Sequence, residues 1–188
     1  MTAEILGLRY LHEGWTRFGL ARVRLADGTE VEREVEDHGD SVGVLPYDRA
    51  RRVAMLVREL RVPALLVAGE QSQLEAPAGI IDGGDPEENA RREALEETGL
   101  RLHVLEPVGV TYSCAGISTE RIHLFLAPYG TADREQAGGG VADEHENIRV
   151  VEMPLAALAA LADKGGLTDL KTLTLVLALR SRHPDLFG

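Results

Sequence analysis

Alternating apolar and polar positions dominate the first forty residues and predict β-strands. Three such runs cover Glu4 to His12, Trp15 to Leu25 and Glu30 to Glu36. Between the last two, Asp27-Gly28 is a hairpin-turn signal. Three short strands with few large apolar residues make only a thin sheet. We therefore expect residues 1–40 to form a small antiparallel unit that gains from packing against another surface, such as a second copy of the chain.

Further β-type runs follow a polar break at residues 37–40. They cover Val42 to Leu45, Arg52 to Leu60, Gln73 to Ala76, Leu102 to Thr111, Glu120 to Ala127 and Ile148 to Val151. In the fifth run, the alternation of Ile122, Leu124 and Leu126 is typical of a half-buried strand. The stretch 137–146, three glycines followed by acids, predicts a flexible loop.

Two helices are predicted at the end of the chain. Pro154 opens the first, and Gly165-Gly166 ends it. The second starts near Thr168-Asp169, ends before Pro184 and is apolar almost all round, which predicts a largely buried helix. Strands on both sides of one central helix, with two helices at the end, favour an α+β fold in which a mixed sheet lies between helices.

The central helix lies in the stretch from Gly79 to Leu100. Pro86 after Asp85 predicts its start, with the Asp85 side chain as the cap, and Gly99 predicts its end. Inside it, three acids share one helical face because they stand three or four positions apart: Glu93, Glu96 and Glu97.

Like charges at this spacing destabilise a helix by roughly 0.2–0.5 kcal/mol per pair unless something neutralises them. A hard divalent cation, which prefers carboxylate oxygens, would do so. The alternative is an ordinary solvated face on which Arg91 and Arg92 supply the partners.

Chain length, apolar runs, cysteine count and net charge limit the classes of protein to which the chain can belong. At 188 residues the chain suits one domain, or one domain with a small appendage. No apolar run approaches the ~20 residues that a membrane helix needs, and no secretory signal opens the chain, so we expect a cytoplasmic protein with no membrane partner. The single cysteine, Cys114, excludes an internal disulfide and is expected to serve packing. A net charge of −11 argues against binding nucleic acid.

The acids occur within a longer motif. R-E-x-x-E-E-x-G-L from Arg92 to Leu100, preceded by E-A-P-A-G from Glu75 to Gly79, resembles the signature box of the Nudix hydrolases, G-x5-E-x7-R-E-U-x-E-E-x-G-U. Asp85 replaces the first Glu, and six residues rather than seven precede Arg92, so the loop is one residue short. The resemblance implies a Nudix α/β/α sandwich over residues 41–188, with residues 1–40 as an added β domain for dimerisation and substrate contacts.

The similarity extends to the nucleoside-diphosphate-sugar branch of that family. The motifs that carry it are V-R-E-L-R-V from Val57, Y-S-C-A-G-I-S-T-E from Tyr112, A-G-G-G-V from Ala137 and R-E-V-E-D-H-G from Arg33. A-G-G-G-V and the short box most resemble the GDP-mannose hydrolase subgroup. The resemblance implies a homodimer that hydrolyses GDP-mannose to GMP and mannose 1-phosphate with Mg²⁺ or Mn²⁺. The alternatives are ADP-ribose hydrolysis, to AMP and ribose 5-phosphate, and a nucleotide-sugar sensor that binds without hydrolysing.

The resemblance also assigns the site residues. The metal ligands it implies are the Ala78 carbonyl, Glu93, Glu97 and Glu146. Glu96 would help through water and Glu144 would be the general base, although the two loop acids could exchange roles or act only as solubilising charges. Arg61 and Arg33 are expected to bind the diphosphate, because a planar guanidinium matches phosphate oxygens in pairs. Trp15 would stack on the base, and the alternative for it is packing.

Overall fold

The computed structural model describes residues 2–140 and 148–188. By its internal contacts the chain divides into two compact units. Unit 1 contains residues 1–40 and 112–121, and unit 2 contains residues 41–111 and 122–188. Sequence order places the segment 112–121 among the later strands, but its contacts join it to unit 1. None of the helices in the described ranges is long and apolar enough to cross a membrane.

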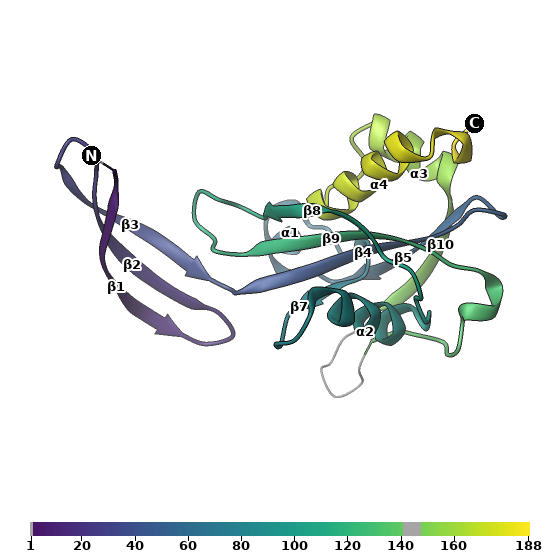
Figure 1. The fold of residues 1–188 in the computed structure, drawn as a ribbon, viewed down its shortest axis with the longest axis horizontal. Helices are drawn as coiled ribbons and strands as arrows, with labels where there is room; N and C mark the ends of the chain where they lie inside the picture. The colour runs from purple at the N-terminus through teal and green to yellow at the C-terminus, as the bar shows by residue number, and fades with distance from the viewer. Residues whose placement is uncertain (1, 141–147) are drawn as a thin grey trace. The chain divides into compact units, whose positions relative to one another are not determined.

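Unit 1 is a three-stranded antiparallel sheet, drawn in purple in Figure 1, and the three predicted strands are confirmed. Its strands, in order, are β1 (Glu4–Glu13), β2 (Arg17–Arg24) and β3 (Glu30–Asp37). Gly28 has φ +90° in the predicted hairpin turn. The segment 112–121 lies along β3, where Glu36 N donates to Ile117 O at 2.9 Å. Cys114 in this segment is exposed, so the packing role expected for it is wrong.

Unit 2 is built on a mixed seven-stranded sheet with main order β10-β5-β4-β9-β8, to which β6 adds beside β5 and β7 beside β4. The strands are β4 (Asp40–Asp48), β5 (Val53–Glu59), β6 (Gln73–Glu75), β7 (Ala78–Ile80), β8 (Glu106–Tyr112), β9 (Arg121–Pro128) and β10 (Arg149–Pro154). The helices of the described residues are α1 (Val62–Ala68), α2 (Pro86–Thr98), α3 (Leu155–Asp163) and α4 (Leu170–Arg182), with 3₁₀ turns at Thr131–Asp133 and Pro184–Leu186.

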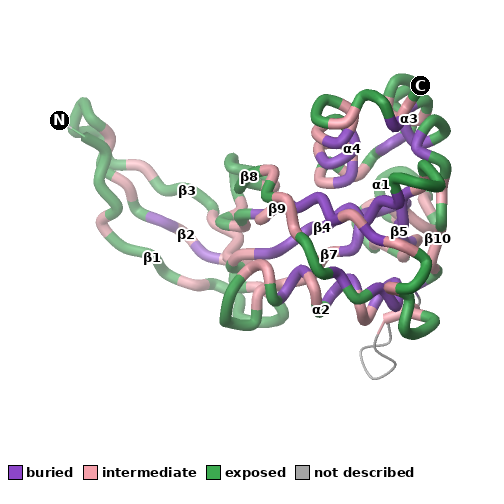
Figure 2. The backbone as a smooth tube through the Cα atoms, turned by 45° about the vertical axis from the view of Figure 1, so that its right-hand side comes forward, coloured by how far each residue is buried: buried purple, intermediate pink, exposed green. Residues whose placement is uncertain are grey.

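The two faces of this sheet carry two separate apolar cores. Figure 2 marks the buried stretches of the backbone in purple. Strand β9 shows why, since successive side chains of a strand point to opposite faces. Ile122, Leu124 and Leu126 pack with the apolar side chains of α3 and α4. Phe125 and Ala127 pack with the alanines of α2. The sheet therefore lies between α2 and the pair α3–α4 (Figure 1), which confirms the predicted α/β/α arrangement.

One helix was not predicted, and one expectation about another helix was wrong. Helix α1 was not predicted, because V-P-A-L-L-V-A has the composition of a short buried strand. Pro63 near its start and Gly69 in the left-handed conformation at its end are ordinary helix limits. Helix α4 has the predicted bounds but is not largely buried, since Leu170 and Leu177 are exposed. Only one side of α4 faces the sheet, so its remaining apolar residues stay in contact with water.

Candidate metal and diphosphate site

Helix α2 begins and ends where its sequence predicts. Pro86 is its first residue, and Gly99 closes it with φ +75°. The Asp85 side chain, however, makes no capping hydrogen bond, so the cap role expected for it is wrong. Asn89 ties the preceding loop to the first turn instead. Its amide nitrogen donates to Gly83 O at 2.9 Å and to Asp85 O at 3.0 Å.

The three acids of α2 do not share one environment. Glu93 and Glu97 are buried, with 9% and 4% of their surface exposed, while Glu96 is partly exposed. Arg92 pairs with Glu93 at 2.8 Å and with Glu96 at 3.0 Å. Glu96 therefore fits the surface-pair alternative. Glu93 also pairs with Arg92, but neither Glu93 nor Glu97 lies on a solvated face, and burying two carboxylates on one helix is costly unless positive charge compensates them.

Strand β7 brings backbone against Glu93. Gly79 lies opposite Val42 in the antiparallel β4–β7 pair. A Cβ atom added to Gly79 would come within 2.1 Å of Glu93 Oε1. Because glycine has no Cβ, the Glu93 carboxylate can lie directly against the Gly79 backbone. Ala78, the residue expected to offer a carbonyl to the metal, is the neighbour of Gly79 in the same strand.

Arg61 lies just after β5, at the first position before α1. Its guanidinium binds Glu75 in a two-pronged contact, with Nε to Oε1 at 2.8 Å and Nη2 to Oε2 at 3.0 Å, and also pairs with Glu59 at 2.9 Å. Burial lowers the pKa of Arg61, but Glu75, Glu59 and Glu97 outweigh it and raise the pKa above its usual range. Because the charge of Glu97 acts on it, Arg61 belongs to the same electrostatic environment as the acids of α2.

Glu75 was given no role from the sequence, although it opens the E-A-P-A-G motif. It is 2% exposed and also pairs with Lys171 of α4. Burial raises the pKa of Glu75, but the hydrogen bond from Arg61 and the charge of Lys171 overcome that effect and lower the pKa. Glu75 therefore stays ionised between two cations from different parts of the chain.

The described part of the glycine-rich loop, residues 137–140, is held against the end of α2, and residues 141–146 of the loop predicted there lie outside the described residues. Gly139 N donates to Glu97 O at 2.8 Å, and Gly140 N donates to Glu96 O at 3.1 Å. These bonds satisfy carbonyls that a helix end leaves open. The packing is close, since a Cβ on Gly138 would lie 2.5 Å from Glu97 O.

The two loop acids expected at the site, Glu144 and Glu146, lie outside the described residues. Among residues 2–140 and 148–188, no three His, Cys, Asp or Glu side chains come together as a metal-binding group. The described part of the chain supplies two buried carboxylates on α2, the β7 backbone beside them and Arg61. Carboxylate and carbonyl oxygens are the ligands that Mg²⁺ and Mn²⁺ prefer, so this donor set fits such a cation.

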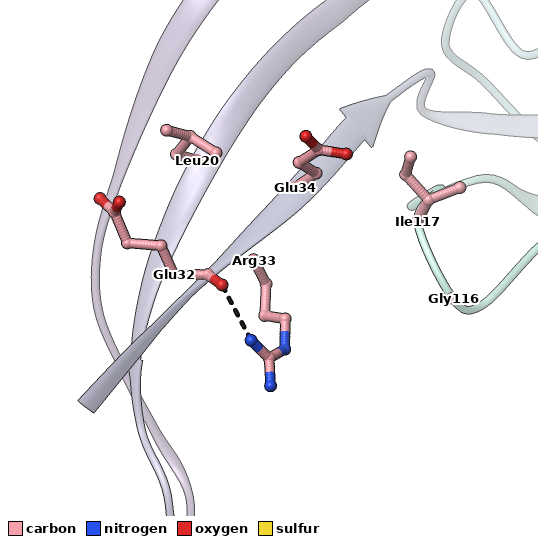
Figure 3. A pocket seen from close by; sticks show the side chains of 6 residues that line it. All are labelled: Leu20, Glu32, Arg33, Glu34, Gly116 and Ile117. Atoms are coloured by element: carbon pink, nitrogen blue, oxygen red, sulfur yellow. Dashed lines mark hydrogen bonds between the residues drawn. The ribbon is translucent and has the colours of Figure 1, made fainter. Parts of the chain in front are cut away.

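Arg33 and Trp15 belong to unit 1. Figure 3 shows Arg33 in a pocket of about 450 Å³, lined also by Leu20, Glu32, Glu34, Gly116 and Ile117. Arg33 Nη1 donates to the Glu32 carbonyl at 2.9 Å. Trp15 is 82% exposed in the single chain, and its ring lies edge-on to that of His38, with the ring centroids 5.5 Å apart.

Comparison with known proteins agrees with this description. The NUDIX domain family matches residues 37–174. GDP-mannose pyrophosphatases are similar over most of the chain: that of Cronobacter sakazakii is 40% identical over 152 residues (80% of this chain and 78% of that protein), and that of Pectobacterium atrosepticum is 40% identical over 145 residues (77% and 74%). A crystal structure of an ADP compounds hydrolase has the same fold, with TM-score 0.78 and 19% identity over 98% of this chain and 96% of that one. The chain belongs to the Nudix family.

Proposed function

We propose that this protein hydrolyses the diphosphate of nucleoside diphosphate sugars, with GDP-mannose as the preferred substrate. The products would be GMP and mannose 1-phosphate. The observation that carries the proposal is the similarity to GDP-mannose pyrophosphatases, which covers about four-fifths of the chain at 36–40% identity. The buried pair Glu93 and Glu97, of which the Glu93 carboxylate lies against Gly79, supports the use of a divalent cation.

Each described residue has a role that its surroundings suit. Glu93 and Glu97, with the Ala78 carbonyl, would hold Mg²⁺ or Mn²⁺. A cation bound there would neutralise the diphosphate oxygens and lower the pKa of the attacking water. Arg61 would orient the diphosphate, because Glu75 already fixes the plane of its guanidinium. Glu96, which is partly exposed while Glu93 and Glu97 are buried, would act through water.

The water must also lose a proton, and a carboxylate is a suitable acceptor. Glu144 as the base and Glu146 as a further metal ligand rest on the sequence alone, because both lie outside the described residues. Hydrolysis balances without any other reactant. Water adds its oxygen to one phosphorus, the bridging P–O bond breaks, and each product carries one of the two phosphates.

ADP-ribose, cleaved to AMP and ribose 5-phosphate, is the second candidate substrate. The structural neighbour, an ADP compounds hydrolase, favours it, but 19% identity supports a shared fold only. The two substrates differ in both base and sugar, so one panel separates them. We expect kcat/KM for GDP-mannose to exceed that for ADP-ribose in the presence of Mg²⁺. The reverse order would transfer the assignment to ADP-ribose, and tight binding without turnover of either would favour a sensor.

We propose a homodimer in solution. Strand β1 exposes Ile5, Leu8 and Leu11, and helix α1 exposes Leu66 and Val67. Exposed large apolar side chains gathered on one strand or one helix mark an interface more often than a free surface. A second copy of the chain would cover them, and light scattering should give twice the mass of the 20.4 kDa chain. A monomeric mass would contradict this.

The roles of Arg33 and Trp15 stay proposals from the sequence. Glu32 and Glu34 flank Arg33, so its pocket alone carries net negative charge and does not suit a diphosphate. Exposed Trp15 has a free ring face for a base, and Trp15→Ala should raise KM with little change in kcat. A cytoplasmic location and the absence of nucleic-acid and membrane partners likewise rest on composition.

A further inference from the structure

The first turn of α4 is bonded to the chain just before β7. Thr172 is fully buried, and its hydroxyl accepts a hydrogen bond from Ala76 N at 2.6 Å. The same hydroxyl donates to Asp169, whose side chain also caps the helix by accepting from Thr172 N at 2.9 Å. Asp169 therefore fixes the direction of the hydroxyl, so that its lone pair faces the Ala76 amide.

The neighbouring residue on α4 makes a second bond to the same segment. Lys171 Nζ pairs with Glu75, and with Asp169 at 3.1 Å. The Glu75 side chain is 2% exposed and the Lys171 side chain 10%, so both charges are largely out of water. Arg61 binds Glu75 from the other side. Consecutive residues of α4 thus hold consecutive residues, Glu75 and Ala76.

The chain from Glu75 to Gly79 is fixed along its whole length. Pro77 O accepts a hydrogen bond from Val44 N at 2.9 Å, and Ala78 and Gly79 pair with β4. Gly79 in turn lies against Glu93. A movement of the segment at Ala76 would therefore reach the Ala78 carbonyl, two residues further along, and the Glu93 carboxylate that lies against Gly79.

Stability alone does not explain this cluster. Well-packed apolar side chains at such buried positions are often as stabilising as an ion pair, or more so. Buried polar groups are best attested where they fix one arrangement among several. Here they select the position of the segment Glu75–Gly79.

We propose that Lys171 and Thr172 are positioning residues for the metal site. This inference rests on the proposed function, because it takes Ala78 and Glu93 as metal ligands. Residues that orient ligands from behind typically change metal affinity by roughly 10-fold to 100-fold when they are lost. The two α4 residues act on the ligands through Glu75 and Ala76, and they contact neither metal nor substrate.

The test measures Mn²⁺ binding to the protein without substrate, by electron paramagnetic resonance, together with Tm. Thr172→Val keeps the shape of the side chain and removes the hydroxyl, so the Mn²⁺ Kd should rise about tenfold or more. Thr172→Ser keeps the hydroxyl, so its Mn²⁺ Kd should equal that of the wild-type protein. The matched control is Thr174→Val on the same helix, where the lost hydroxyl donates to the Leu170 carbonyl of its own helix. The Mn²⁺ Kd of this variant should not change.

Lys171→Met provides an independent variant with its own control, Lys164→Met at the exposed end of α3. We expect a higher Mn²⁺ Kd for Lys171→Met and an unchanged Kd for Lys164→Met. If Thr172→Val does not fold, Lys171→Met decides. A folded Thr172→Val or Lys171→Met protein that binds Mn²⁺ as tightly as wild type would overturn the positioning role alone. Wild-type protein that binds no Mn²⁺ and cleaves no nucleotide sugar would overturn the proposed function as well.

Discussion

Gly79 and Glu93 are in such close contact that a single added carbon would place Cβ 2.1 Å from Glu93 Oε1. One residue comes from a short edge strand and the other from the middle of α2. Their contact ties the helix to the backbone that would share a metal with it. The atom in the way is the end of a flexible side chain, so Glu93 would yield while the backbone stays in place.

Gly79→Ala should therefore harm activity more than stability. We expect kcat/KM for GDP-mannose to fall roughly 100-fold, because the displaced carboxylate would no longer meet the metal. The free energy of unfolding should change by less than about 1 kcal/mol. Gly109→Ala is the control, since nothing lies within 4 Å of a Cβ there. If Gly79→Ala is as active as wild type, the assignment of Glu93 as a metal ligand is contradicted.

Glu97→Gln keeps the shape of the side chain and removes its charge. Turnover of GDP-mannose should fall about a thousandfold, or ~4 kcal/mol, because metal-borne charge stabilisation is worth several kcal/mol. The protein should stay folded by circular dichroism. Glu88→Gln, exposed on the same helix, should retain full activity. Full turnover by Glu97→Gln would contradict its assignment as a ligand.

Gly138 and Gly28 both have positive φ but differ in their surroundings. A Cβ on Gly138 would meet the Glu97 carbonyl at 2.5 Å, whereas nothing lies within 4 Å of one on Gly28. Gly28→Ala should cost only backbone strain, ~1–2 kcal/mol. Gly138→Ala should cost more than about 3 kcal/mol, because overpacking against rigid backbone adds to that strain. Urea unfolding measures the stability of both variants. Equal losses of unfolding free energy would show that residues 137–140 do not pack tightly against α2.

Asp48 should make stability depend on pH in the acid range. It is 4% exposed and accepts hydrogen bonds from Ala50 N at 2.9 Å, Arg51 N at 3.0 Å and Arg51 Nε at 2.7 Å. Burial raises the pKa of Asp48, but these bonds from Arg51 and Ala50 prevail and lower it below 3.8. A depressed folded-state pKa adds stability that is present above the unfolded pKa and is lost as pH falls through the folded one.

Asp48→Asn should therefore be less stable than wild type at pH 7 by about 1–3 kcal/mol, the cost of breaking a buried hydrogen-bond set. The gap should narrow as pH falls below about 4, because Asp48 of the unfolded chain takes up a proton there before Asp48 of the folded chain does. Urea unfolding of both proteins across about pH 3 to 7 measures this. A gap that stays constant over that range would show that the Asp48 pKa is not depressed.

Local signals in the sequence were enough for the bounds of α2 and for the unit 1 hairpin. Pro86, Gly99 and Gly28 each act on the backbone beside them, so no distant contact was needed to place them. The same reasoning missed α1, since a seven-residue apolar helix and a buried strand share a composition. It also gave Asp85 a cap that its side chain does not make.

The candidate site could be predicted only where the motif is contiguous. Helical spacing places Glu93, Glu96 and Glu97 on one face, but it does not predict which of them are buried. The pairing of Arg61 with Glu75 spans 14 residues, and that of Lys171 with Glu75 spans 96. Such contacts depend on how the strands and α4 pack, which no local pattern encodes. The sequence identified Glu75 as part of a motif and Asp169 as a helix-start residue. It did not indicate that both pair with Lys171.

The central claim is that this chain uses a divalent cation to cleave the diphosphate of GDP-mannose. ³¹P nuclear magnetic resonance of purified protein with GDP-mannose and Mg²⁺ tests it most directly, with an EDTA-treated sample alongside. We predict that the two coupled diphosphate signals disappear and that two phosphomonoester signals, from GMP and mannose 1-phosphate, replace them only when Mg²⁺ is present. An unchanged diphosphate spectrum with Mg²⁺, or equal cleavage in EDTA, would contradict the claim.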